Sequence, residues 1–169
     1  MSHDVPTALR YERVGPEHVG ELAALFERNR IPAVTEMFDP FPLDADQARK
    51  IALEGGEDAF YVALRGELAV GFSMLRGFDE GYAIPSFGIF VDRSSHGQSI
   101  GRELTAWTIE QARRRGCPGV RLTVYAANVA ARRLYDSLGF VEQQRQSIDR
   151  MGRSDEKVVM RLDFGGQDG

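Results

Sequence analysis

A glycine-containing turn stands directly in front of an amphipathic helix in the stretch SSHGQSIGRELTAWTIEQARRRG, residues 94–116. Free backbone N–H groups at a helix N-terminus, together with the positive end of the helix dipole, form a binding site for anions. Arg102 would favour a bound phosphate, and the first acidic side chain, Glu103, comes only inside the helix. The alternative is a tight turn that does no more than start a packed helix. The candidate phosphate-binding residues are Gly97, Gln98, Ser99, Ile100, Gly101 and Arg102.

Two common phosphate-binding motifs are absent from the chain. No G-x-x-x-x-G-K-[ST] sequence occurs, which excludes a P-loop nucleotide hydrolase. No G-x-G-x-x-G sequence occurs either, and the turn follows the fourth expected strand instead of the first. A dinucleotide-binding fold is therefore not expected.

Three consecutive segments carry a resemblance to a known family. The strand SFGIFVD, the turn and helix HGQSIGRELTAWTIEQARRRG, and the segment VRLTVYAANVAARRLYDSLGFVE together resemble the GCN5-related N-acetyltransferases (GNAT). The resemblance is close over residues 84–142, and N-x-x-A-x-x-L-Y-x-x-x-G-F, which starts at Asn128, is its most specific part. The turn departs from the family's Gln/Arg-x-x-Gly-x-Gly/Ala pattern, because His96 and Ser99 occupy the first and fourth positions, whereas Gly101 is retained.

The resemblance implies that the turn binds the pyrophosphate of acetyl-CoA through backbone amides. Ser99 must then adopt a backbone conformation that glycine adopts without steric cost. Strands 84–91 and 120–125 would splay and let the pantetheine arm lie between them, held by backbone groups of Ile89, Phe90 and Val91 as an added strand would be. One N–H group there would polarise the thioester carbonyl.

The implied reaction is direct transfer of the acetyl group to an amine within a ternary complex. Tyr135 is the candidate general acid, because a phenol pKa of about 10 lies above that of a thiol, about 8.5, and permits proton donation to the leaving thiolate. The alternative is a core tyrosine with a buried, bonded hydroxyl. Asn128 is expected to cap its helix and also to contact the cofactor.

The general base is not identified by the sequence. Thr123 stands where ribosomal-protein alanine acetyltransferases of the family carry a glutamate, and a threonine cannot accept the proton in its place. The remaining candidates are loop carboxylates, or a water chain held by Ser86 and Thr123. The loop carboxylates are Glu36, Asp39, Asp79 and Glu80.

The acceptor site is expected between the proline-rich segment 31–43 and the loop 76–84, which together are rich in aromatic and acidic residues. A small cationic amine, or the amine of a peptide, would be held by carboxylates over an aromatic floor. The candidate substrate-binding residues are Glu36, Phe38, Asp79 and Tyr82. Three alternatives stay open: aromatic residues that only seal the core, an acceptor that is a hydroxyl compound or amino sugar, and a non-catalytic domain that binds or senses acyl-CoA.

The order of the expected elements indicates a mixed α/β fold of one domain, residues 1–164, followed by a frayed tail at 165–169. Strands alternate with helices, and a meander of strands lies in the centre. Two of these strands join at Arg65-Gly66, and Asp44 with Gln47 predicts the start of a helix. The family implies a central mixed sheet of six to seven strands flanked by about four helices.

Composition limits the classes of partner. The net charge of −4 argues against general nucleic-acid binding, which needs clustered positive charge. The chain has one cysteine, no apolar leader and no run long enough for a membrane span, so we expect a cytoplasmic protein without a metal site. The open edges of the sheet leave homodimerisation open.

Overall fold

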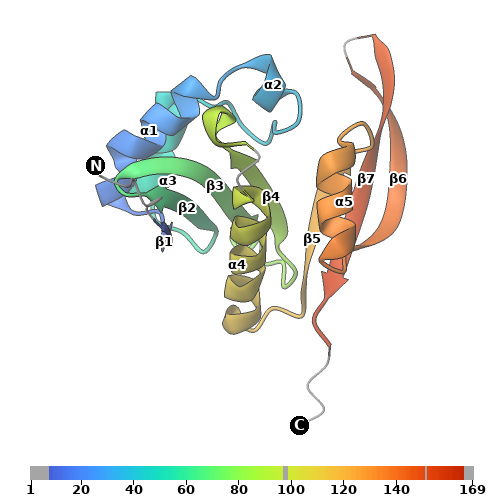
Figure 1. The fold of residues 1–169 in the computed structure, drawn as a ribbon. Helices are drawn as coiled ribbons and strands as arrows, with labels where there is room; N and C mark the ends of the chain where they lie inside the picture. Colours follow the sequence, from blue (N-terminus) through green and yellow to red (C-terminus); the bar gives the residue numbers. More distant parts are fainter. Residues whose placement is uncertain (1–7, 97–98, 151, 166–169) are drawn as a thin grey trace, which may run out of the picture.

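The computed structural model describes residues 8–96, 99–150 and 152–165. Figure 1 shows the arrangement of the elements. The strands are β1 (Leu9–Arg13), β2 (Ala59–Arg65), β3 (Leu68–Arg76), β4 (Ser86–Val91), β5 (Gly119–Tyr125), β6 (Val141–Arg150) and β7 (Arg153–Asp163). The helices are α1 (Val19–Arg28), α2 (Pro32–Thr35), α3 (Ala45–Leu53), α4 (Ile100–Arg115) and α5 (Val129–Ser137), with short 3-10 turns at Pro16–His18 and Arg93–Ser95.

The strands form one sheet in the order β1-β2-β3-β4-β5-β7-β6. All neighbouring pairs are antiparallel except β4 and β5, which are parallel. These two strands share only the residue pair Ser86 and Arg121 and then diverge toward their carboxyl ends. The predicted splay and the mixed α/β fold are therefore confirmed.

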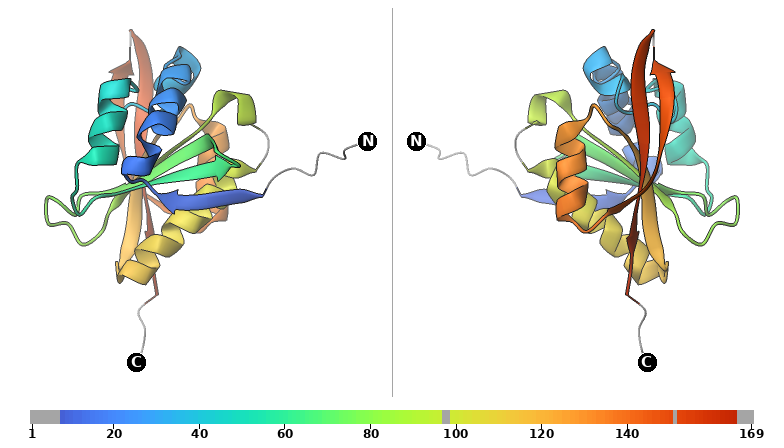
Figure 2. Two further views of the ribbon diagram at one scale, coloured as in Figure 1. Left: turned by 90° about the vertical axis from the view of Figure 1, so that its left-hand side faces the viewer. Right: turned by 90° about the vertical axis from the view of Figure 1, so that its right-hand side faces the viewer.

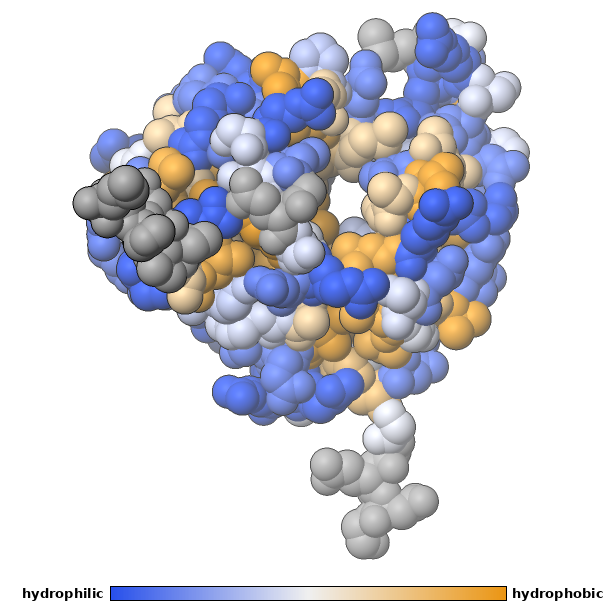
Figure 3. Space-filling view, viewed as in Figure 1, coloured by the Kyte–Doolittle hydropathy of each residue, from blue (hydrophilic) through white to orange (hydrophobic). Residues whose placement is uncertain are grey.

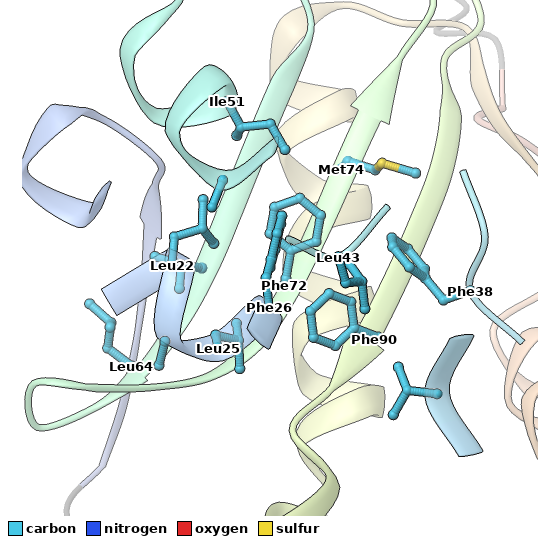
Figure 4. Close-up of a cluster of buried hydrophobic side chains, with 14 residues drawn as sticks. Leu22, Leu25, Phe26, Phe38, Leu43, Ile51, Leu64, Phe72, Met74 and Phe90 are labelled. Atoms are coloured by element: carbon cyan, nitrogen blue, oxygen red, sulfur yellow. The ribbon is translucent and has the colours of Figure 1, made fainter. Parts of the chain in front are cut away.

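Helices cover both faces of the sheet (Figure 2). Residues of α1, α2 and α3 pack on one face around Phe26, Phe72 and Phe90, whose rings lie 5.1–5.8 Å apart (Figure 4). Residues of α4 and α5 pack on the other face around the apolar side chains of β5. β4 contributes Phe90 to the first core and Phe87 to the second, whereas β5 contributes buried residues only to the second.

Local sequence signals explain most of the helix boundaries. The Asp44 side chain accepts from the Gln47 N–H at 2.8 Å, and the Asn128 side chain accepts from the Ala131 N–H at 3.3 Å, so both predicted caps are confirmed. The structure has one helix more than expected, since α2 forms a single turn that starts at Pro32, a position where proline is tolerated. No described helix is long and apolar enough to cross a membrane.

Candidate active site

A cleft passes through the sheet where β4 and β5 separate. One cavity of about 420 Å³ lies on the α4–α5 side, and a second of about 490 Å³ opens on the opposite side. Figure 3 shows the molecule hollowed between the part that carries β4 and the part that carries α5. Residues that line both cavities are Met37, Phe38, Phe87, Gly88 and Thr123. A ligand in the first cavity could therefore meet a ligand in the second.

The cavity on the α4–α5 side, called here the cofactor-side cavity, gathers most of the residues expected to bind the cofactor. The strands, the start of α4 and the inner face of α5 all contribute to its wall. The expected residues that line it are Ile89, Phe90, Val91, Gly101, Asn128 and Tyr135. Gly97 and Gln98 lie outside the described residues.

The edge of β4 that faces β5 has unpaired backbone groups. Successive residues of an antiparallel strand alternate the side to which their backbone groups point. The Asp92 N–H donates to a carbonyl of β3 at 2.8 Å, so Phe90 also points its backbone to β3, whereas Ile89 and Val91 point theirs into the opening. His96 Nε2 lies 3.1 Å from the Val91 carbonyl oxygen. Phe90 therefore lines the cavity without offering it backbone hydrogen bonds.

Ser99 immediately precedes α4 in the left-handed backbone region, with φ 60° and ψ 12°. It is the one non-glycine residue with positive φ among the residues described. The expectation that Ser99 adopts a conformation typical of glycine is therefore confirmed, and the turn keeps its shape at a cost in strain. The Ser99 side chain makes no capping hydrogen bond, so it does not offset this strain by stabilising the start of the helix.

Gly101, Arg102 and Ile100 have three different environments at the start of α4. A Cβ on Gly101 would meet only Val91 Cγ2, at 3.7 Å, so the protein itself leaves room there. The Arg102 guanidinium donates to Ser137 Oγ of α5 at 2.7 Å. The Ile100 side chain is buried in the core, so only its backbone could reach a ligand. The nearby Glu103 carboxylate accepts from the Tyr11 hydroxyl at 3.1 Å.

A buried polar cluster fixes the end of β4 and was not identified from the sequence. The Asp92 carboxylate accepts from Arg28 Nε at 3.1 Å, from Asn29 Nδ2 at 2.8 Å and from Ser94 Oγ at 2.6 Å. Burial raises the pKa of Asp92, but these hydrogen bonds and the Arg28 charge outweigh it and hold the pKa below the usual value. Its partners Arg28 and Asn29, at the C-terminal end of α1, lie more than sixty residues away in sequence, beyond the reach of local patterns.

Tyr135 is a core residue whose hydroxyl is available to a ligand. Its ring packs edge-on against Phe87 and Phe140, with ring centroids 6.2 and 5.7 Å away. Burial raises the pKa of Tyr135 well above its usual value, so the phenol keeps its proton at neutral pH. Among the residues that the structure describes, none forms a hydrogen bond with this hydroxyl, although the side chain lines the cofactor-side cavity.

The second cavity, called here the acceptor-side cavity, contains only part of the expected substrate site. Phe38 and Tyr82 line it, as do the carboxylates of Asp39 and Glu80. Glu36 lies in an adjoining cavity instead, where its carbonyl oxygen accepts from Arg150. Of the four loop acids, two thus reach the cavity through which an acceptor would enter.

Asp79 lies away from the cleft and holds a loop. Its carboxylate accepts from the backbone N–H groups of Glu57 at 2.9 Å and Asp58 at 3.2 Å. These two hydrogen bonds lower the pKa of Asp79. Asp79 lines a different cavity beside α3. The structure therefore separates it from the other expected substrate residues and gives it a local structural role.

Sequence reasoning named Ser86 and Thr123, which both line the acceptor-side cavity, but missed several of its other residues. Arg121 and Tyr125 alternate with Thr123 along β5 and also line the cavity, and the alternation in VRLTVY was the available signal. The Tyr125 hydroxyl donates to Asp39 at 2.7 Å. Burial and this hydrogen bond raise the pKa of Tyr125 to about 12. Arg76 and Lys157 also line the cavity. No cluster of three or more metal-ligating side chains occurs in the part of the chain that the structure describes.

The family model for the acetyltransferase (GNAT) family matches residues 22–140, most of the length of this chain. The chain belongs to the acetyltransferase (GNAT) family. The family that the sequence motifs implied is therefore confirmed. Members of this family use acetyl-CoA. The matched range contains β4, the turn, α4 and α5, which are the elements that build the cofactor-side cavity.

A curated relative of this GNAT chain is a mycothiol acetyltransferase from Brachybacterium faecium, 39% identical over 82 residues. That match covers 47% of this chain and 25% of the relative, so the chain spans well under half of the relative's length. Another mycothiol acetyltransferase, from Thermobispora bispora, is 37% identical over 99 residues, 56% of this chain and 32% of the relative.

Solved structures confirm the fold. A GNAT-family acetyltransferase from Streptococcus pneumoniae superimposes with a TM-score of 0.75 at 21% identity, covering 94% of this chain and 100% of the other. The yncA structure from Salmonella typhimurium, which contains its cofactor acetyl-CoA, has a TM-score of 0.75 at 18% identity and covers 96% and 97% of the two chains.

Proposed function

We propose that this chain transfers the acetyl group of acetyl-CoA directly to a primary amine of a small molecule. The observation that carries the proposal is the cleft between β4 and β5, since the cofactor-side cavity and the acceptor-side cavity share Gly88 and Thr123. Acetyl donor and amine can then meet in one complex, and proximity of this kind lowers the barrier for a two-substrate reaction.

The residues of the cofactor-side cavity fit acetyl-CoA. Ile89 and Val91 offer the backbone hydrogen bonds of an unpaired strand edge, as expected for an amide-containing pantetheine arm. The start of α4 offers N–H groups and a positive dipole end to a pyrophosphate, and the missing Cβ of Gly101 leaves space beside it. When bound, acetyl-CoA supplies an acetyl group activated as a thioester.

Two groups of the chain would act on that thioester. The Ile89 N–H would donate to the thioester carbonyl oxygen and stabilise the negative charge that grows there. The Tyr135 hydroxyl would donate its proton to the departing sulfur, a role that requires the phenol to be protonated. Burial raises the pKa of Tyr135, which meets this requirement because the phenol is protonated at neutral pH.

The amine must lose a proton on the acceptor side. Asp39 and Glu80 are the carboxylates of the acceptor-side cavity in the described chain, which leaves Glu36 and Asp79 out of this role. Asp39 is the one of the two whose carboxylate accepts a hydrogen bond within the cavity, from the Tyr125 hydroxyl at 2.7 Å. We therefore assign the proton acceptor to Asp39, directly or through a bound water.

The name of the curated relatives supports a small-molecule acceptor over a peptide. A non-catalytic domain that binds acyl-CoA is the second candidate function, because Thr123 stands in place of the glutamate expected in some relatives. The position of Tyr135 in the wall of the cofactor-side cavity favours the enzyme, since a sensing domain has no need for a proton donor there.

Replacement of Tyr135 by Phe tests the enzyme function. The substitution removes only the hydroxyl, so we expect kcat for amine-dependent thiol release to fall at least about tenfold while the Kd for acetyl-CoA stays within twofold. Tyr61→Phe is the matched control, because Tyr61 is a buried tyrosine that packs on Trp107 outside both cavities. Equal kcat for wild type and Tyr135→Phe would remove the assigned role.

A further inference from the structure

Two arginines and a serine lie side by side across three strands at the closed end of the cleft. Ser86 of β4 pairs with Arg76 of β3 on one side and with Arg121 of β5 on the other. Arg121 Nε donates to Ser86 Oγ at 3.1 Å, so these side chains share a face of the sheet. All three line the acceptor-side cavity, and so does Lys157 of β7.

These cations have no carboxylate partner within the part of the chain that the structure describes. The Arg76 guanidinium lies 5.7 Å from the ring centre of Phe41, and the Arg121 guanidinium lies 5.6 Å from that of Tyr82. Aromatic faces orient a guanidinium without neutralising it. Arg161, the next member of the same row on β7, is by contrast ion-paired with Asp163 and does not line the cavity.

The charge of the acceptor-side cavity differs from the acidic floor expected for a simple cationic amine. Arg76, Arg121 and Lys157 outnumber the two carboxylates, Asp39 and Glu80. The Asp39 carboxylate is moreover partly satisfied by the Tyr125 hydroxyl. Arg121 is exposed and Arg76 and Lys157 are partly buried, so a ligand that enters the cavity displaces water from them, which is costly unless it brings the opposite charge. The cavity is thus built for an acceptor with an anionic group.

We propose, resting on the proposed acetyltransferase function, that the acceptor is a primary amine that also carries a carboxylate or phosphate, bound by Arg76 and Arg121. Guanidinium groups form paired hydrogen bonds with both anions. Ser86 and Arg121 lie two residues before Gly88 and Thr123, where the two cavities meet. At about 3.3 Å per residue, these two positions lie roughly 7 Å apart along the strands. The arginine side chains can reach part of this distance, so the anion would bind less than that far from the reacting amine.

Matched pairs of amines test the acceptor class. Thiol release from acetyl-CoA is measured with glycine, β-alanine and 4-aminobutyrate against their amides, and with phosphoethanolamine against ethanolamine, at equal concentrations of unprotonated amine. We expect kcat/KM to be at least about tenfold higher for the anionic member of one series, since hydrogen bonds to a charged group are among the strong ones. The series with the larger preference distinguishes a carboxylate from a phosphate.

Single variants assign the preference to the row of arginines. Arg76→Gln and Arg121→Gln should each raise KM for the preferred anionic amine about tenfold or more and leave KM for its neutral partner unchanged. Arg161→Gln is the control and should leave both unchanged. Equal kcat/KM of the wild type for anionic and neutral amines would overturn the anion site. The same would follow if the two variants raised KM alike for both kinds of amine. Either result would leave the acetyltransferase function intact. If none of the amines raises thiol release above the enzyme-free rate, the proposed function itself is overturned, and with it the acceptor class.

Discussion

Gly101→Ala separates the cofactor-binding role of this position from its role in folding. Gly101 is the second residue of α4, and an added Cβ would meet only Val91 Cγ2 at an ordinary contact distance of 3.7 Å. Alanine is favoured over glycine by about 1 kcal/mol inside a helix, and by about half of that in the first turn. For a chain of this size the melting temperature should therefore rise by about 1–2 °C.

The same methyl group should weaken cofactor binding. Gly101 lines the cofactor-side cavity, so its new Cβ would occupy space next to the backbone donors of the turn. We expect the Kd for acetyl-CoA to increase about tenfold or more, which corresponds to about 1.4 kcal/mol. Thermal unfolding without ligand measures the first effect, and calorimetric titration of acetyl-CoA measures the second.

Gly20→Ala is the matched control for both measurements. Gly20 is likewise the second residue of its helix, α1, and an added Cβ would meet nothing within 4 Å. This variant should gain similar stability and bind acetyl-CoA as wild type does. Unchanged affinity in Gly101→Ala would refute the assignment of this glycine to the cofactor site, and a melting temperature below that of wild type would refute the expected effect on folding.

Three further predictions concern the turn, the proton acceptor and the alkaline stability of the fold. Ser99→Gly should stabilise the protein by a few tenths to about 1 kcal/mol, because relief of the left-handed strain exceeds the added flexibility of the unfolded chain; a lower melting temperature than wild type would contradict this. Asp39→Asn should lower kcat/KM at least about tenfold at neutral pH. Asp79→Asn should leave kcat/KM unchanged and lower the free energy of unfolding, which denaturant unfolding would measure. The pKa of Tyr125 is about 12 in the folded state and near 10 in the unfolded chain. The contribution of this tyrosine to stability is therefore complete below pH 10 and is lost between about pH 10 and 12. Unfolding free energies measured across that range should fall less steeply in Tyr125→Phe, and identical slopes would exclude the tyrosine as the cause.

Local signals were sufficient for the elements that hold the cofactor site. The apolar spacing of α4 and the Asn128 cap act over a few residues, and the structure places both as expected. The motif that spans the turn also identified Ser99 as a residue that must adopt a glycine-like conformation. Such features are set by neighbours in sequence, which is why a sequence reveals them.

The acceptor side depended on contacts that no local pattern contains. Asp39 and Asp79 are both acidic residues of loops, but Asp39 meets Tyr125 across 86 positions whereas Asp79 folds back on the backbone of Glu57 and Asp58. The row of Arg76, Ser86 and Arg121 depends on the register between three strands. Strand register is fixed by packing on both faces of the sheet and by turn geometry, so no local pattern revealed the charge of this cavity.

Whether the protein forms a homodimer stays open. The outer edge of β6 carries mostly exposed, polar side chains, which is a common way for an edge strand to avoid pairing. Sedimentation of the purified chain with and without acetyl-CoA would show whether a homodimer forms. The cleft that carries the proposed function is built from one chain in either case.

The most direct test of the central claim measures free thiol and acetylated amine in the same reaction. Wild-type protein is incubated with acetyl-CoA and a panel of primary amines, thiol is followed by colour, and the N-acetyl product is quantified by mass spectrometry. Direct transfer through the β4–β5 cleft predicts thiol and N-acetyl product in equal amounts for at least one amine, at a rate that scales with enzyme concentration. Saturable binding of acetyl-CoA, with no amine raising thiol release above the enzyme-free rate, would contradict it and leave a non-catalytic acyl-CoA-binding domain as the function.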